Sequence, residues 1–145
     1  MSATDTKLDD TYQLDDQVGY LLWLANQRHA AIFQAHGVAD LTPTQFSALI
    51  RLAEHGKCSQ NQLGRLAAMD IATIKGVVDR LKQKALVQTE PSTEDRRRSL
   101  ISLSPAGQAL IAELKAAGHA ITAATLEPLS AAEQRTFLKL LRKLV

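Results

Sequence analysis

Three consecutive arginines, Arg96 to Arg98, follow directly on Asp95 and give this sequence its densest positive charge. Arginine side chains fit narrow minor grooves of DNA, where the negative potential is strongest, and a neighbouring carboxylate can hold a guanidinium extended. Taken alone, such a run is more often a solvated surface than a nucleic-acid contact. Its meaning therefore depends on the residues that come before it.

A second set of residues with a possible role in recognition lies on residues 70–84, which read as a helix with a small, polar outer face. The major groove of B-DNA is about 12 Å wide and admits one α-helix. Thr73 offers a hydroxyl and a methyl group, and Lys75 offers a mobile cation. Ala72 and Gly76 allow close approach, although a mid-helix glycine costs about 1 kcal/mol relative to alanine. Gly76 is equally well explained by approach to a groove or by close packing against the preceding helix.

The preceding helix, expected at residues 59–67, begins with two amide side chains. Gln60 and Asn61 are placed to bond phosphates beside free backbone N–H groups. The residues expected to contact DNA are therefore Gln60, Asn61, Ala72, Thr73, Lys75, Gly76, Arg80, Asp95, Arg96, Arg97 and Arg98.

Helix-capping residues and turn residues indicate which helices and strands carry these side chains. Ser59 to Gln62 form a capping box, and Asp70 is a good N-cap for the next helix. Residues 86–90 and 99–103 read as short strands joined by a loop at 91–98. A short helix, a tight turn, a second helix and a hairpin together have the layout of a helix-turn-helix with a wing.

Longer helices are predicted on both sides of this unit. Residues 13–36 form one helix with an apolar stripe, and Thr42 opens another as part of a capping box. A helix follows from Ser104 to about residue 125, and Ser130 opens the last one. The stripe of the first helix comprises Val18, Leu22, Ala25, His29, Ile32 and Phe33.

Length and composition bound the class of protein. The 145 residues suit one domain, and 46% of them are apolar. The single cysteine excludes an internal disulfide and favours a reducing cytoplasm. The longest apolar stretch, at residues 21–25, is too short to cross a bilayer, and the polar, acidic N-terminus predicts no signal sequence. Net charge is only +2, yet residues 75–98 hold seven cations against four anions, which favours a polyanionic partner.

Catalytic and metal-binding patterns are not expected. No nucleophile–base–orienter set, phosphate loop or carboxylate pair is visible, so we predict that the protein is not an enzyme and needs no cofactor. His29 and His36 are seven residues apart and share a helical face. Four histidines and one cysteine without a tight cluster nevertheless predict no metal site.

Several segments together resemble the MarR family (multiple antibiotic resistance regulators) in both order and spacing. These segments are T-P-T-Q-F from Thr42, S-Q-N-Q-L-G-R-L-A from Ser59, I-K-G-V-V-D-R-L from Ile74, Asp95 with Arg97, and L-S-P-A-G from Leu103. The resemblance implies a single, mainly α domain over 1–145, with about six helices and a two-stranded β wing. It implies a winged helix-turn-helix at 42–103 and an obligate homodimer built from helices within 13–36 and 105–145.

The resemblance also implies roles for single residues. Helix 70–84 would be the recognition helix, and Arg97 would enter the minor groove. Many members carry Thr-Arg where this chain has Lys75-Gly76. We therefore assign to Lys75 the phosphate contact that the family's arginine makes.

Regulators of this kind usually bind a small aromatic anion between the dimer helices and the DNA-binding lobe. We expect a ligand-responsive repressor, released from a pseudo-palindromic operator by an aromatic acid or phenol and linked to aromatic compound catabolism. The candidate ligand-binding residues are Tyr20, Trp23, Gln27, Arg28, His29, Phe46 and Arg51. The alternative is that three of them, His29, Trp23 and Phe46, are ordinary core or interface residues.

Two other functions are weighed against this one. Cys58 precedes a helix, where a thiolate gains from the dipole, so a redox-responsive regulator is one alternative. A ligand-independent winged-helix adaptor that contacts proteins is the other. Steep salt dependence of duplex binding would separate a DNA-binding dimer from an adaptor or an enzyme.

Overall fold

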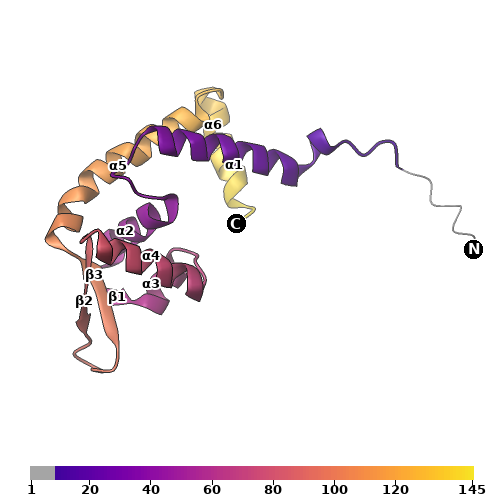
Figure 1. Cartoon of the computed structure of the whole chain (residues 1–145). Coiled ribbons are helices and arrows are strands. Elements are labelled where there is room, and N and C mark those ends of the chain that lie inside the picture. The colour runs from indigo at the N-terminus through magenta and orange to yellow at the C-terminus, as the bar shows by residue number, and fades with distance from the viewer. Residues whose placement is uncertain (1–8) are drawn as a thin grey trace, which may run out of the picture.

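The computed structural model describes residues 9–145, so the first eight residues of the expected domain lie outside the described part. Figure 1 shows two regions, with α1, α5 and α6 in one and α2 to β3 in the other. The elements are η2 (Leu14–Asp16), α1 (Val18–Ala35), α2 (Pro43–His55), β1 (Cys58–Ser59), α3 (Gln60–Leu66), α4 (Ile71–Gln83), β2 (Val87–Pro91), β3 (Ser99–Leu103), α5 (Pro105–Leu126) and α6 (Ala131–Arg142). The expected mainly α fold with a winged helix-turn-helix is confirmed.

One continuous core joins the helices of the DNA-facing lobe, which we define as residues 41–103, to the first half of α5. Leu49 of α2, Leu63 of α3, Ile74 and Leu81 of α4, and Leu114 of α5 are each at most 1% exposed. Full burial of such a side chain contributes about 1.5–3 kcal/mol. The lobe therefore holds α3 and α4 in a fixed relation to α5.

The predicted helix starts agree with the structure at two capping boxes and in part at a third. Thr42 and Ser130 accept hydrogen bonds from the backbone N–H three residues on, and both boxes are closed by the reciprocal side chain. Ser59 Oγ also accepts from the backbone N–H of Gln62, at 3.2 Å. The Gln62 amide lies 3.2 Å from His55 Nε2 instead of closing the box, because the end of α2 lies beside the start of α3.

The sheet has one strand more than the sequence predicted. Strands β2 and β3 pair antiparallel from Val87 opposite Leu103 to Pro91 opposite Ser99. The two-residue strand β1 pairs with the other edge of β3, with Cys58 opposite Ile101. The predicted two-stranded wing, β2 with β3, is therefore confirmed. The sequence did not predict β1, because a two-residue strand is too short to carry any alternation of polar and apolar residues. This pairing ties the start of α3 to the middle of strand β3.

The first helix begins later than predicted and leaves most of its apolar stripe exposed. Gln17 is extended, with φ −85° and ψ 135°, and separates η2 from α1, so the prediction of one helix from residue 13 is wrong. Phe33 is the only buried residue of α1, whereas Val18 is 65% exposed. On α6, Phe137 and Leu140 are also exposed. The apolar surfaces of α1 and α6 thus lack cover from other described residues of the chain.

The start of α5 is packed directly against the start of the hairpin. Ser104 Oγ donates to the carbonyl of Ala85 at 2.7 Å, and the Ser104 backbone N–H donates to Leu86 O at 3.0 Å. A Cβ on Gly107 would lie 2.1 Å from Leu86 O, so only glycine fits this approach. Over residues 9–145, none of the helices has the length and apolar character needed to cross a membrane.

Candidate nucleic-acid interface and effector pocket

Helix α4 buries one face and presents the other to solvent. The predicted inner residues Ile74, Val77, Val78 and Leu81 are all buried. Ala72, Thr73, Lys75 and Arg80 of the predicted DNA-contacting set are exposed on the outside, and Gly76 is half-buried. Asp70 Oδ1 accepts the backbone N–H of Thr73 at 2.7 Å and caps the helix. This hydrogen bond lowers the pKa of Asp70 and keeps the cap ionised at neutral pH.

Gly76 is not explained by packing, which was one of its two predicted roles. A Cβ at this position would meet only Arg80 Nη1, at 3.5 Å, and no atom of α3. The glycine that packing requires is Gly64 of α3, where a Cβ would lie 3.1 Å from Met69 O and 3.2 Å from Ile74 Cγ2. The close crossing of α3 and α4 therefore depends on Gly64, and groove approach remains the prediction for Gly76.

Lys75 and Arg80 differ in their present partners. Lys75 Nζ lies 3.0 Å from Asp79 Oδ2, one turn along the same exposed ridge. A solvent-exposed pair of this kind contributes only about 0.3–0.5 kcal/mol, so a phosphate can replace the carboxylate. Arg80 has no ion-pair partner among residues 9–145.

The wing tip holds the arginine–carboxylate pair that the sequence predicted. Asp95 Oδ1 accepts the backbone N–H of Arg97 at 3.0 Å and its side-chain Nε at 3.2 Å. These bonds, the backbone one first, lower the pKa of Asp95. The Arg97 side chain is nevertheless 92% exposed. Ser92 Oγ orders the turn by accepting the backbone N–H groups of Glu94 and Asp95.

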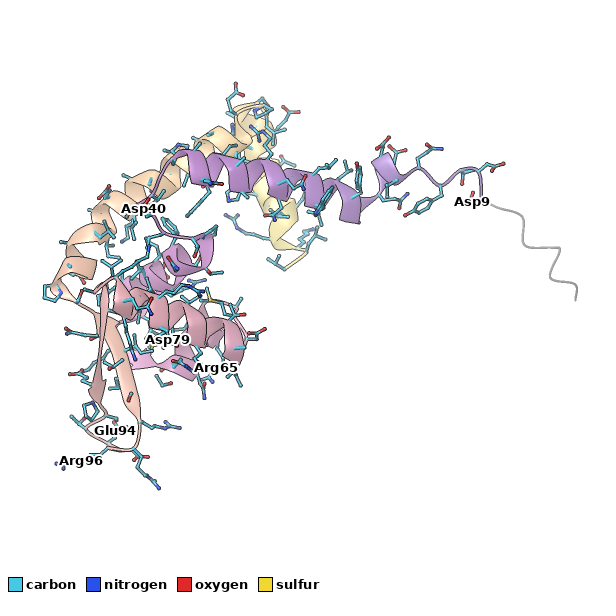
Figure 2. The ribbon with its side chains drawn as sticks, in the orientation of Figure 1. Asp9, Asp40, Arg65, Asp79, Glu94 and Arg96 are labelled. Atoms are coloured by element: carbon cyan, nitrogen blue, oxygen red, sulfur yellow. The ribbon has the colours of Figure 1, made fainter. Side chains whose placement is uncertain are left out.

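A hollow of about 550 Å³ lies between α3 and the tip end of strand β3, and it brings predicted residues of the helix and the wing together. Its lining includes Gln60 and Asn61 from α3 and Arg98 from the wing. Arg65, which the sequence analysis missed, also lines it and lies one turn after Asn61 on the same helical face. In Figure 2, Arg65 lies on the helical body of the lobe and Arg96 lies at the far end of the hairpin. The cations are thus spread from the helices to the wing tip.

A second hollow, of about 460 Å³, lies where α1, α2 and α5 meet, and we call it the effector pocket. Of the predicted ligand-binding residues, His29 and Phe46 line it. The Phe46 ring meets the Phe33 ring edge to face, with centroids 5.7 Å apart. A Cβ on Gly118 would lie 3.2 Å from Phe46 Cζ, so this glycine makes room for the ring. The complete lining is His29, Phe33, Pro43, Phe46, Ser47, Ile50, Glu54, Lys115, Gly118, His119, Ile121 and Thr122.

The other predicted ligand-binding residues lie outside this pocket. Tyr20 and Trp23 stack on each other, with centroids 6.0 Å apart, on the part of α1 that precedes the pocket. Arg28 donates to the carbonyls of Thr125, at 2.6 Å, and Ala124, at 3.0 Å, at the end of α5. Arg51 pairs with Glu54 at 2.9 Å on the surface, and Gln27 is exposed on α1. Gln27, Arg28 and Arg51 are thus separated from the pocket by their position around the helix, and Tyr20 and Trp23 by their position along it.

Two basic residues of the pocket were missed because residues 105–125 were read only as a dimerisation helix. Lys115 and His119 lie one turn apart on α5, and both line the pocket. The signal available in the sequence was their spacing of four in a segment otherwise rich in alanine and glycine. They provide cationic and hydrogen-bonding groups opposite the aromatic rings of α1 and α2.

A hydrogen-bond chain fixes the orientation of His29. Thr125 Oγ1 donates to the carbonyl of Ile121 at 2.8 Å, and His29 Nδ1 lies 2.9 Å from the same hydroxyl oxygen. Because the hydroxyl proton is already used, His29 Nδ1 must be the donor. In the neutral imidazole, Nε2 is then an acceptor for a ligand.

Cys58 lacks the environment that a redox sensor needs. Its side chain lies within the core at 2% exposure, on strand β1. Burial raises the pKa of the Cys58 thiol, so the reactive thiolate is disfavoured. This environment argues against the redox-responsive alternative. In the part of the chain that the structure describes, no group of three or more His, Cys, Asp or Glu side chains could hold a metal ion.

Comparison with known proteins agrees with this arrangement of helices and wing. The MarR family model matches residues 41–99. NicR, a helix-turn-helix transcriptional repressor from Pseudomonas putida, is 41% identical over 146 residues, covering 99% of this chain and 92% of NicR.

Two solved structures are similar over most of their length. A probable transcriptional regulator from Pseudomonas aeruginosa is 53% identical, with a TM-score of 0.89, over 92% of this chain and 100% of that one. BpsR from Bordetella bronchiseptica, whose DNA binding is regulated by 6-hydroxynicotinic acid, is 40% identical, with a TM-score of 0.85, over 92% and 96%. This chain therefore belongs to the MarR family of transcriptional regulators.

Proposed function

We propose that this protein is a cytoplasmic, homodimeric repressor that binds a pseudo-palindromic operator and is released from it by a small aromatic acid. The observation that carries this proposal is the joint surface of α3, α4 and the wing. There, a capped helix with small outer residues lies beside arginines that have no ion-pair partner among residues 9–145, namely Arg65, Arg80, Arg96 and Arg98. The positive charge of such a surface is complementary to the negative charge of a DNA groove and its flanking phosphates.

The position of each side chain suggests which part of the DNA it contacts. We assign Thr73 of α4 to the major groove, with Ala72 and Gly76 allowing close approach. The residues assigned to phosphates along the groove edges are Gln60, Asn61, Arg65, Lys75, Arg80 and Arg98. Asp95 holds the Arg97 side chain extended at the wing tip. We assign Arg97, with Arg96 beside it, to the minor groove.

Dimerisation is supported by the apolar surfaces of α1 and α6. A groove of about 510 Å³ runs between these helices and is lined almost wholly by apolar side chains. Its lining comprises Val18, Leu21, Leu22, Ala25, Phe137, Leu140, Leu141, Lys143 and Leu144. A second copy that covers this groove would bury it and carry a second α4. Half-sites about one helical turn apart, roughly 34–36 Å, suit such a pair.

The effector class is argued from the chemistry of the pocket. Phe33 and Phe46 provide flat apolar walls for an aromatic ring, and Lys115 and His119 can bind a carboxylate. Glu54 also lines the pocket, but Arg51 lies 2.9 Å from its carboxylate and offsets its repulsion of an anion. His29 Nε2 can accept a hydrogen bond from a ring hydroxyl or ring N–H. The ligand that regulates BpsR, 6-hydroxynicotinic acid, has this combination of groups.

Release of DNA follows from where the pocket lies. Its walls come from α1 and α5 of the helical region and from α2 of the DNA-facing lobe. A ligand that binds one arrangement of these helices more tightly shifts the population toward it. Release requires that this arrangement separates the two α4 helices by a distance that does not fit the operator.

The proposal is tested by fluorescence anisotropy with duplexes selected from a random library by the full-length protein. We expect affinity to fall by orders of magnitude between about 50 and 200 mM salt. At fixed salt, 6-hydroxynicotinic acid should release the duplex, whereas the non-aromatic cyclohexanecarboxylic acid should not. A protein that binds no duplex at low salt would refute the DNA-binding function and favour a protein-binding adaptor. Salt-dependent binding that no aromatic acid alters would refute the effector part alone.

A further inference from the structure

Ile71 is an exposed aliphatic side chain in a place where the fold does not need one. Among residues 9–145 it is the only large hydrophobic residue of the DNA-facing lobe that is exposed, at 73%. All the others lie before residue 25 or after residue 136. They are Tyr12, Leu14, Val18, Leu21, Leu22, Trp23, Leu24, Phe137, Leu140, Leu144 and Val145. Those residues flank or line the proposed dimer surface, whereas Ile71 lies in the DNA-facing lobe.

Helix formation does not explain an isoleucine at this position. Ile71 is the first residue of α4, and Asp70 already caps the helix. A β-branched residue loses side-chain freedom in a helix, and acidic residues or proline are favoured in a first turn. Because it is exposed, Ile71 also adds little burial of apolar surface. Its side chain must therefore contribute in some way other than to the stability of the lobe.

The surroundings of Ile71 point to a nucleic-acid contact. It precedes Lys75 by one turn, so the two share the exposed ridge of α4. A hollow of about 560 Å³ between α3 and α4 is lined by Ile71 and Ala72 on one side and by Asn61 and Arg65 on the other. In helix-turn-helix proteins, the N-terminal residues of the second helix contact base edges.

We propose that Ile71 contacts the C5 methyl group of a thymine in each half-site and selects that base. This inference rests on the proposed DNA-binding function. The thymine methyl is the one apolar group that an unmodified base pair presents in the major groove, so it is the partner that an isoleucine there can recognise. Uracil has the same hydrogen-bonding edge but lacks the methyl group, so exchange of the two bases isolates this contact.

The experiment uses the full-length protein and a duplex that it selects from a random library. Each thymine of the half-sites is replaced in turn by deoxyuridine, and affinity is measured by anisotropy for the wild type, Ile71→Ala and Ile71→Val. For the wild type, replacement of the thymine at one position of each half-site should lower affinity about three- to fivefold, as expected for loss of one buried methyl group. Ile71→Ala should lose a similar factor on the thymine duplex and be indifferent to uracil there. Ile71→Val should retain part of the discrimination.

The outcomes separate this inference from the function on which it rests. A wild-type protein that selects no duplex refutes the DNA-binding function itself. If the protein binds its duplex and every uracil is tolerated equally by all three proteins, the thymine contact is refuted while DNA binding stands. If Ile71→Ala changes the oligomeric state in sedimentation, Ile71 belongs to a protein interface and the inference also fails. Circular dichroism of Ile71→Ala should match the wild type.

Discussion

The DNA-facing lobe and the helical arm formed by α1 and α6 differ in how far they bury their apolar residues. In the lobe, Leu49, Leu63, Ile74 and Leu81 are at most 1% exposed. In the arm, α6 has no buried residue and α1 has only Phe33. Similar apolar stripes in the sequence thus lead to a closed core in one region and to open surfaces in the other. The lobe completes its core within one chain, whereas in the proposed dimer a second copy covers the arm.

The strongest test of this difference places a charge in the open surface of the arm. Leu140→Glu puts a carboxylate into the groove between α1 and α6, where burial of an unpaired charge by a second copy is costly. We expect a monomer in light scattering and a loss of operator affinity of at least about 100-fold, because the second half-site contact is lost. Lys139→Glu is the matched control, since Lys139 is exposed on α6 and does not line the groove. An unchanged dimer would mean that this groove is not the interface.

A smaller effect is expected from the wing, which belongs to the closed lobe and acts through its surface. Arg97→Ala should weaken operator binding by about 1–3 kcal/mol at matched salt without altering the dimer. Arg135→Ala on α6 removes the same charge from the arm and should change affinity far less. Equal losses in the two variants would show that net charge, and not the wing tip, accounts for the effect.

The effector pocket, at the junction of the two regions, gives the next prediction. Thr125→Val removes the hydroxyl that holds His29 Nδ1, so Nε2 is no longer kept as the acceptor. We expect about a fivefold loss of affinity for 6-hydroxynicotinic acid, the value of roughly one hydrogen bond. Operator affinity without ligand should be unchanged, and Thr125→Ser should restore ligand binding. Calorimetric titration of the free protein measures the affinity for the ligand. A Thr125→Val protein with wild-type ligand affinity would show that the hydrogen bond from His29 to Thr125 plays no part in ligand binding.

The smallest effect is expected at Gly76, where one substitution should raise the stability of the lobe and lower its affinity for DNA. Gly76→Ala should stabilise the protein by about 0.5–1 kcal/mol, since a Cβ there meets only Arg80 Nη1 at 3.5 Å and helix propensity improves. If the helix approaches DNA closely at this residue, operator affinity should fall at the same time. Gly64→Ala is the comparison, because its Cβ would crowd Met69 O and Ile74 Cγ2 and lower the stability. Thermal unfolding and anisotropy measure the two effects, and a stabilised variant with full affinity would remove Gly76 from the interface.

Local signals in the sequence predicted much of this fold because they act within a few residues. Asp70 and Ser130 cap their helices as expected, and the inner face of α4 follows from its spacing. The third strand could not be found this way, because Cys58 and Ser59 count as a strand only through their pairing with β3. The role of Gly64 depends on a crossing partner that the sequence does not reveal.

The candidate site was predicted unevenly for a related reason. Asp95 and Arg97 are two residues apart, so their pairing is visible in the sequence. The effector pocket is assembled from three helices, so the membership of Lys115 and His119 depends on how α5 crosses α1 and α2. Tyr20 and Trp23 share the helix of His29 but lie on an earlier part of it, where composition alone could not exclude them.

The junction at Gly107 has a mechanical consequence. Since the start of α5 is fixed to Leu86 at the root of the hairpin, its 22 residues form a rod about 33 Å long with the wing attached to one end. If α5 tilts by about 5° about its other end, the end that carries the wing is displaced by about 3 Å, close to the spacing of successive bases on one strand. A molecule that fits between α1 and α5 therefore needs to change their angle only slightly to move a wing off its groove.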